Sequence, residues 1–147
     1  MGGTFDILHK GHRALLVKAS EIGNIVLIGL TTDERARKDR KEAEINTYET
    51  RKENLEILLD SMKLPSNFQI VPLENDWGPS VVEASFTAII VSEETKKTAE
   101  RINEVRIMNG KNKLEIVTVP FVKAYDGQKI SSSRIRNNEI DSNGQLA

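Results

Sequence analysis

The sequence contains no cysteine, few aromatic residues and no excess of charge of either sign. The absence of cysteine excludes disulfides, zinc–cysteine sites and thiol nucleophiles, and it fits a reducing compartment. The 21 basic and 22 acidic side chains leave a net charge of −1, whereas proteins that bind a nucleic-acid backbone usually carry a basic excess. Aromatic residues make up only 5% of the chain. We therefore expect no nucleic-acid partner, and any bound polyanion should be small and held by a local cluster.

Long apolar runs are missing as well. No stretch approaches the roughly 18 apolar residues that span a membrane, and Met1 is followed by Gly-Gly rather than by a signal sequence. We expect a cytoplasmic protein without a membrane partner. A length of 147 residues with 38% hydrophobic content suits a single domain over residues 1–147, in which the polar residues 141–147 form a frayed tail.

Short apolar runs rich in Ile and Val alternate with stretches of helical periodicity. The apolar runs are residues 25–30, 68–71, 87–91 and 114–119, and the helical stretches are residues 12–22, 47–64 and 93–108. Continuous apolar runs of this length are typical of strands that are covered on both faces, as in a parallel sheet. The alternation predicts an α/β fold with right-handed crossovers.

The first candidate site is the N-terminal motif, residues 2–12, with the sequence Gly-Gly-Thr-Phe-Asp-Ile-Leu-His-Lys-Gly-His. It holds both histidines of the chain, His9 and His12, at the start of an expected helix. Residues three apart share a helical face, so the two imidazoles can point the same way. A helix start offers unpaired N–H groups to phosphate, and glycines let the backbone approach a ligand closely.

Two other interpretations of this motif are open. The glycines can form a simple turn beside two exposed histidines. Alternatively, His9, His12 and Asp6 can form a triad of metal ligands. The metal interpretation leaves the features that favour phosphate unexplained.

The second candidate site is the C-terminal motif, residues 126–136, with the sequence Asp-Gly-Gln-Lys-Ile-Ser-Ser-Ser-Arg-Ile-Arg. Ser131 to Ser133 are typical of an N-cap and first helical turn. Their hydroxyls can donate hydrogen bonds, and Lys129, Arg134 and Arg136 supply positive charge. Taken alone, the segment is explained better as a solvated, capped helix. Its pairing with the N-terminal motif favours a binding site.

Together the two motifs resemble the nucleotidyltransferase superfamily, whose members carry an H-x-G-H signature and a late I-S-S-[ST]-x-[IV]-R signature. The segments between them are similar to the archaeal phosphopantetheine adenylyltransferases and to the matching domain of eukaryotic coenzyme A synthase. These segments are Asn-Asp-Trp-Gly-Pro at 75–79, Val-Ser-Glu-Glu-Thr at 91–95 and Ile-Asn-x-x-Arg at 102–106. The resemblance covers essentially the whole chain and implies a Rossmann-like, doubly wound parallel sheet of the nucleotidyltransferase type.

The resemblance implies that the chain transfers the adenylyl group of ATP to 4′-phosphopantetheine, which gives dephospho-coenzyme A and pyrophosphate. Mg²⁺ should travel with the ATP rather than occupy an all-protein site. The acceptor phosphate is already anionic, so no general base is needed. Two alternatives remain. The first is an adenylyl- or cytidylyltransferase that acts on another phosphate acceptor, namely FMN or nicotinamide mononucleotide with ATP, or glycerol-3-phosphate with CTP. The second is a non-catalytic module that binds a nucleotide or coenzyme A.

The resemblance also implies the site residues. The expected catalytic residues are His12, His9, Thr4 and Lys38. The expected nucleotide-binding residues are Gly3, Phe5, His12, Ser131, Ser132, Ser133, Arg134 and Arg136. In this assignment His12 and Thr4 contact the reacting phosphoryl group, His9 helps to hold the ATP phosphates, and the serines grip the β- and γ-phosphates with one of the two arginines.

Three further features are assigned by the same reasoning. The basic segment 35–41 is either a solvated face or a mobile loop that closes over the phosphates through Lys38. Trp77 is expected to pack in the core or to line the pantetheine site. Arg51 is expected to lie on the surface, with a phosphate ligand as the alternative.

The chain departs from the family pattern at two points. Relatives normally carry a hydrophobic strand before Gly-Gly-Thr-Phe, whereas only Met1 stands there; either the chain starts upstream or the strand is short. Ser133 replaces a common threonine and keeps the hydroxyl.

Overall fold

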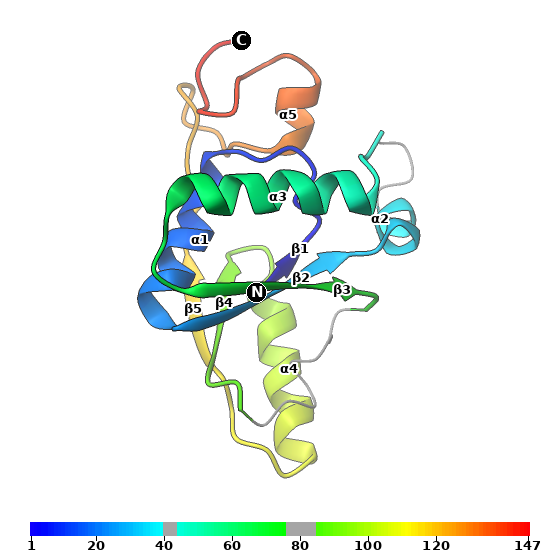
Figure 1. Cartoon of the computed structure of the whole chain (residues 1–147), viewed down its shortest axis with the longest axis vertical. Coiled ribbons are helices and arrows are strands. Elements are labelled where there is room, and N and C mark those ends of the chain that lie inside the picture. Colours follow the sequence, from blue (N-terminus) through cyan, green and yellow to red (C-terminus); the bar gives the residue numbers. More distant parts are fainter. Residues whose placement is uncertain (40–43, 76–84) are drawn as a thin grey trace.

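The computed structural model describes residues 1–39, 44–75 and 85–147 (Figure 1). Trp77 and the other residues of the segment 76–79 lie outside this description, as do Arg40 and Lys41. The elements follow in the order β1 (Gly2–Gly3), α1 (Lys10–Ile22), β2 (Ile25–Thr31), α2 (Asp33–Asp39), α3 (Tyr48–Met62), β3 (Asn67–Leu73), β4 (Ala88–Ser92), α4 (Lys96–Met108), β5 (Glu115–Val119) and α5 (Ser132–Arg136). Among the described residues, none of the helices has the length and apolar character that crossing a bilayer requires.

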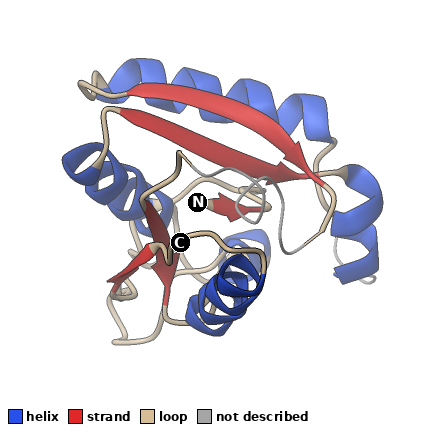
Figure 2. Cartoon of the chain, turned by 90° about the horizontal axis from the view of Figure 1, so that it is seen from below, coloured by secondary structure: helices blue, strands red, loops and turns tan. Residues whose placement is uncertain are grey.

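All strands pair in parallel, which confirms the expected α/β class. The order β1-β2-β3 makes one sheet, in which Ile25 of β2 lies opposite Asn67 of β3, and β4 pairs with β5 in a second sheet. In Figures 1 and 2, α3 and α4 lie on opposite sides of the β2–β3 pair. Within the described part of the chain, no strand pairing joins the two sheets, in contrast to the single sheet expected. The backbone turns into the left-handed region at Phe5 (φ +49°), close behind the two-residue strand β1.

Apolar side chains from strands and helices form the core in three clusters. The first holds Leu16 of α1, Ile28 and Leu30 of β2, and Leu55 of α3, all without solvent exposure. The second lies between β4, β5 and α4, and the third lies next to α5. The apolar runs of β2 and β4 are thus largely buried, as the sequence predicts, whereas β3 and β5 keep exposed positions and are covered less completely.

The C-terminal residues 141–147, which the sequence predicts to fray, carry a β-bridge and backbone hydrogen bonds in the structure. Ile140 is buried in the third cluster and pairs with Leu146 in an antiparallel bridge. The Ser142 carbonyl accepts a hydrogen bond from the Lys10 N–H at 2.9 Å. Backbone hydrogen bonds therefore hold this polar segment against the start of α1, although its side chains are mostly exposed.

The basic segment also differs from the expected loop, because its described residues belong to helix α2. The Thr32 hydroxyl accepts a hydrogen bond from the Arg35 N–H at 3.3 Å at the start of this helix. Asp33 lies in its first turn and Lys38 in its last turn. These charges match the helix dipole at both ends, which stabilises a helix in a segment of this composition.

Arg51 is fully buried, so its expected place on the surface is wrong. Its guanidinium donates hydrogen bonds to the Asn46 carbonyl (2.8 Å) and the Thr4 carbonyl (3.0 Å). It also forms an ion pair with Asp33 at 3.2 Å. A single side chain of α3 thereby joins the N-terminal motif to the beginning of α2.

Candidate active site

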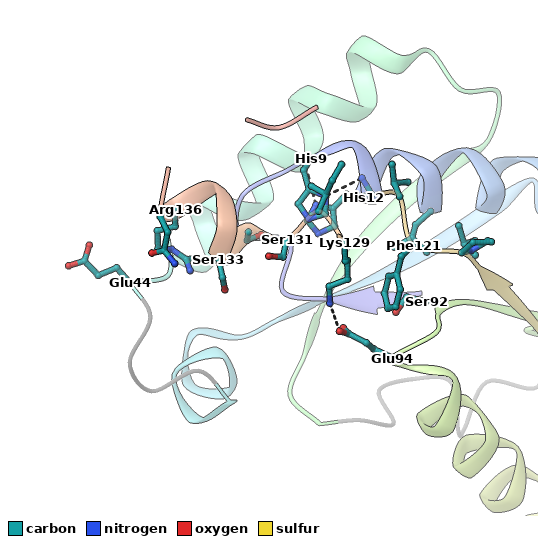
Figure 3. Close-up of a pocket in the computed structure, with 18 of the residues that line it drawn as sticks. His9, His12, Glu44, Ser92, Glu94, Phe121, Lys129, Ser131, Ser133 and Arg136 are labelled. Atoms are coloured by element: carbon teal, nitrogen blue, oxygen red, sulfur yellow. Dashed lines mark hydrogen bonds and ion pairs between the residues drawn. The ribbon is translucent and has the colours of Figure 1, made fainter. Parts of the chain in front are cut away.

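The two motifs line one cavity of about 1180 Å³ at the carboxyl ends of β4 and β5 (Figure 3). The N-terminal motif contributes His9, Gly11 and His12. The C-terminal motif contributes Lys129, Ile130, Ser131, Ser132, Ser133 and Arg136. Ligands of open α/β sheets bind outside the carboxyl ends of the strands, so the cavity lies where this architecture places a substrate.

Side chains near opposite ends of the chain hold the motifs together. The Ser132 hydroxyl donates to the Ile7 carbonyl at 3.1 Å and accepts from the Ile7 N–H at 3.3 Å. Arg136 forms an ion pair with the buried Asp6, whose other oxygen accepts the Asn46 N–H at 2.9 Å. These contacts fix α5 against the N-terminal motif. Convergence of the two motifs is therefore a property of the fold itself.

The two histidines cap α1 reciprocally. The Gly11 N–H donates to Nδ1 of His9 at 3.0 Å, and the His9 N–H donates to Nδ1 of His12 at 3.2 Å. The ring centroids lie 3.9 Å apart. Because both Nδ1 atoms accept, each neutral imidazole carries its proton on Nε2. The capping geometry thus selects the tautomer in which Nε2 is a hydrogen-bond donor.

Gly11 is required by this cap. A Cβ atom at position 11 would lie 2.8 Å from Cε1 of His9, closer than real Cβ atoms come to another atom. The glycine of the H-x-G-H signature therefore makes room for the imidazole that folds back over the first turn. Close approach to the His9 ring is thus sufficient to require glycine here, and Gly11 also lines the cavity.

His9 is buried, and this burial lowers its pKa to about 4, with a further contribution from the charges of Arg13 and Lys129. The unfolded chain, with an ordinary histidine pKa near 6.5, then binds more protons than the folded chain between pH 4 and 6.5. We expect the free energy of unfolding to be highest above pH 6.5 and to fall by about 2–3 kcal/mol towards pH 4 through this group.

Denaturant unfolding at pH 7.5 and pH 4.5 measures this loss. The control is His9→Gln, which cannot titrate, so that the carboxyl groups common to both proteins cancel. The variant should lose less stability on acidification than the wild-type protein. An equal loss in the two proteins would contradict the assignment.

Phe5, Thr4 and Gly3 lie beside the cavity rather than in its lining. Phe5 is buried, and its ring centroid lies 5.0 Å from that of His12. Gly3 and Thr4 line a second cavity of about 530 Å³, and the Thr4 hydroxyl accepts a hydrogen bond from Thr31 at 3.2 Å. Phe5 therefore supports His12, and contact of Thr4 with a phosphoryl group stays a prediction.

The serines and arginines of the C-terminal motif divide into two groups. Ser133 is exposed on the cavity wall, whereas the Ser131 hydroxyl caps α5 by accepting the Arg134 N–H at 3.3 Å. Arg136 lines the cavity, but Arg134 does not. Arg134 instead donates to both carboxylate oxygens of Asp126, at 2.5 and 3.3 Å. Of the two candidate arginines, the geometry thus favours Arg136 as a ligand.

The cavity has further walls that the motifs did not indicate. Lys38 of α2, an expected site residue, lines it as an exposed side chain. Glu94 and Phe121 line it as well, and both follow the carboxyl end of a strand. This position could have indicated both residues from the sequence, because the carboxyl ends of parallel strands meet at one edge of the sheet, where ligands bind.

The structure does not assemble the triad of metal ligands. Asp6 contacts Arg136 and Asn46 instead of the imidazoles. Within residues 1–39, 44–75 and 85–147, no three His, Cys, Asp or Glu side chains are grouped so that they could hold a metal ion.

Known proteins share both the sequence and the fold. Phosphopantetheine adenylyltransferases of Methanosarcina acetivorans and Thermococcus kodakarensis are each 44% identical over 99% of this chain, which covers 93% and 87% of theirs. A bifunctional phosphopantetheine adenylyltransferase/NTP phosphatase of Thermoplasma volcanium is also 44% identical, but this chain spans only 43% of it. A crystal structure of a protein with unknown function from Archaeoglobus fulgidus matches 83% of this chain and 97% of its own, with a TM-score of 0.72 and 32% identity.

A family model described as cytidylyltransferase-like matches residues 1–138, a range that includes both motifs. The recognition made from the motifs is therefore confirmed. The chain belongs to the cytidylyltransferase-like family.

Proposed function

We propose that this chain is a phosphopantetheine adenylyltransferase, which transfers AMP from ATP to 4′-phosphopantetheine and releases pyrophosphate. The observation that carries this proposal is the single cavity shared by the H-x-G-H and I-S-S-S-x-I-R motifs. The acceptor is supported by relatives of that name at 44% identity over 99% of the chain.

The reaction is an in-line displacement at the α-phosphorus. An oxygen of the acceptor phosphate forms the new bond, the bond from the α-phosphorus to the bridging oxygen breaks, and pyrophosphate leaves with that electron pair. The attacking phosphate is anionic at neutral pH and has no proton to give up. Catalysis then consists of aligning two polyanions and stabilising the charge that develops between them.

The residues of the cavity suit these tasks. His12 and His9 present Nε2–H donors, and burial lowers the pKa of His9 to about 4, so that His9 adds no full charge at physiological pH. We assign His12 to the reacting phosphoryl group and His9 to the ATP phosphates. Ser133, Arg136 and Lys38 supply a hydroxyl and positive charge on the opposite walls.

Mg²⁺ would enter with the triphosphate. Among the residues that the structure describes, the carboxylates on the cavity wall are Glu44 and Glu94, and Glu94 is already paired with Lys129. Such a donor set fits an ion held mainly by phosphate oxygens and water, as Mg²⁺ prefers. The ion would neutralise phosphate charge. We further propose that the enzyme works in the cytoplasm on small molecules and not on nucleic acid, as its net charge of −1 supports.

A substrate panel tests the proposal. Pyrophosphate release is measured with ATP or CTP and, in turn, 4′-phosphopantetheine, FMN, nicotinamide mononucleotide and glycerol-3-phosphate. We expect turnover with ATP and 4′-phosphopantetheine to exceed every other pair by at least about 10³-fold, because a site built for a polar partner rejects one that lacks it by that order or more.

Two outcomes of this panel would contradict the proposal. Preferred turnover of another acceptor would assign a different transferase activity. Tight binding of ATP without turnover of any acceptor would indicate a nucleotide-binding module, although groups aimed at a reacting phosphate serve little purpose in a pure binder.

A further inference from the structure

Lys129 and Glu94 form an ion pair across the cavity (Figure 3). Lys129 precedes the serine cluster and is held in a backbone bridge with Lys123. Glu94 lies in the turn between β4 and α4, on the facing wall. The Lys129 ammonium also lies 4.8 Å from the centroid of the Phe121 ring. The pair therefore crosses the space between the C-terminal motif and the end of β4.

A second ion pair, between the cavity residue Arg136 and Asp6 behind it, is built differently. Its side chains are 23% and 1% exposed, whereas those of Lys129 and Glu94 are 36% and 62% exposed. Separating a buried pair leaves a charge without water or partner, which is costly. Separating a solvated pair costs little, because water replaces the lost contact. Of these two cations, Lys129 can therefore change partners.

A bound triphosphate would compete with Glu94 for the Lys129 ammonium. Its positive charge already reaches the N-terminal motif, because it contributes to the lowered pKa of His9. Glu94 is a carboxylate on the wall of a cavity that receives a triphosphate, and the two anions repel each other. A lysine ammonium on a flexible stem can turn from the carboxylate to a phosphate, and the face of Phe121 keeps it within the cavity.

We propose that Lys129 is a phosphate-binding residue and that Glu94 is its partner only while the cavity lacks a triphosphate. Binding then exchanges the carboxylate for phosphate oxygens, and Glu94 weakens binding because it competes for the ammonium. This inference rests on the proposed function, which places a triphosphate in the cavity. It gives Lys129, which the sequence marks only as a positive charge of the C-terminal motif, a specific ligand, and it adds an opposing carboxylate, Glu94.

Calorimetric titration with inorganic tripolyphosphate at fixed ionic strength tests the exchange without an acceptor or a nucleoside. The proteins are wild type, Lys129→Met, Glu94→Gln and the double variant. Lys129→Met should weaken binding about tenfold or more, as expected for loss of a charged contact. Glu94→Gln should tighten it about two- to fivefold, because its solvated pair contributes little. In the Lys129→Met background, Glu94→Gln should have a smaller effect.

Matched controls separate the exchange from a general change of charge. Lys123→Met removes the same charge from the other side of the backbone bridge, and Glu93→Gln removes the carboxylate next to Glu94. Neither residue lines the cavity, so both variants should bind tripolyphosphate within about twofold of wild type. Thermal unfolding of every variant confirms that it is folded.

Three results would overturn the inference: no binding of tripolyphosphate to wild type, unchanged affinity in Lys129→Met, or equal tightening by Glu94→Gln with and without Lys129. The last result would mean that Glu94 weakens tripolyphosphate binding only by long-range electrostatic repulsion and not by competing for Lys129. The substrate panel is independent of this titration. If the expected coupling appears but 4′-phosphopantetheine does not turn over, the exchange stands and the assignment of the acceptor fails.

Discussion

Replacing His12 with alanine is expected to lower turnover of ATP and 4′-phosphopantetheine about 10²–10³-fold, the usual loss for one preorganised donor to a reacting group. The capping geometry holds Nε2–H of His12 as a donor, and the ring packs between His9 and Phe5. The variant also loses half of the reciprocal cap, which costs about 1 kcal/mol of stability. The free energy of unfolding of a domain of this size is about 5–15 kcal/mol, so the variant should stay folded.

Single-turnover release of pyrophosphate, with thermal unfolding alongside, measures this effect. Lys10→Ala is the matched control, because Lys10 is an exposed residue of the same helical turn that does not line the cavity. It should react at close to the wild-type rate. Near-normal turnover in His12→Ala would remove His12 from the catalytic assignment. A loss of folding in the same variant would instead assign it a structural role.

Replacing Arg51 with methionine should have the largest effect on stability, a loss of about 3–5 kcal/mol, because it removes two hydrogen bonds from a charged group, each worth about 1.5–3 kcal/mol, and the ion pair with the partly exposed Asp33. The substitution keeps much of the volume but leaves the Thr4 and Asn46 carbonyls without their donor. It also breaks the contact with Asp33 at the beginning of α2, the helix that carries Lys38. We therefore expect activity to fall as well.

Denaturant unfolding of Arg51→Met, Arg51→Lys and Lys52→Met provides the comparison. Lysine keeps the charge but cannot reproduce the forked hydrogen bonds of arginine, so its loss should be intermediate. Lys52→Met removes a charge from the next position of α3, which is partly exposed, and should cost less than about 1 kcal/mol. A loss below 1 kcal/mol in Arg51→Met would show that the buried network contributes little.

Burial of polar side chains was the property that sequence reasoning missed most clearly. Arg51 lies in a stretch of charged residues on α3 and shows no local pattern that separates it from its neighbours, yet it is fully buried. Its partners are Thr4, Asn46 and Asp33, which come from other parts of the chain. Sequence reasoning could not choose between Arg134 and Arg136 for the same reason. Their positions depend on tertiary ion pairs, of Arg134 with Asp126 and of Arg136 with Asp6.

The ordered backbone of the basic segment and of the C-terminal tail was not predicted, for a related reason. Polar composition predicts exposure, and most of the C-terminal tail is indeed exposed, as are Arg37 and Lys38 of the basic segment. Exposure does not mean disorder, because backbone hydrogen bonds order a polar segment without burying it. The hydrogen bond from the Lys10 N–H to the Ser142 carbonyl joins two backbone groups. It does not depend on which side chains are present, so the sequence alone could not predict it.

By itself the sequence determined the features that depend on near neighbours. The period of its apolar residues predicted parallel strands between helices, Thr47 and Ser131 predicted helix starts through their capping hydroxyls, and the two motifs predicted the family. These signals lie within a few residues of one another, where backbone geometry is enough to interpret them. Only the tertiary structure decided which side chains face the cavity. That choice depends on contacts between residues as far apart as Ile7 and Ser132, whose meeting is set by the packing of the whole core.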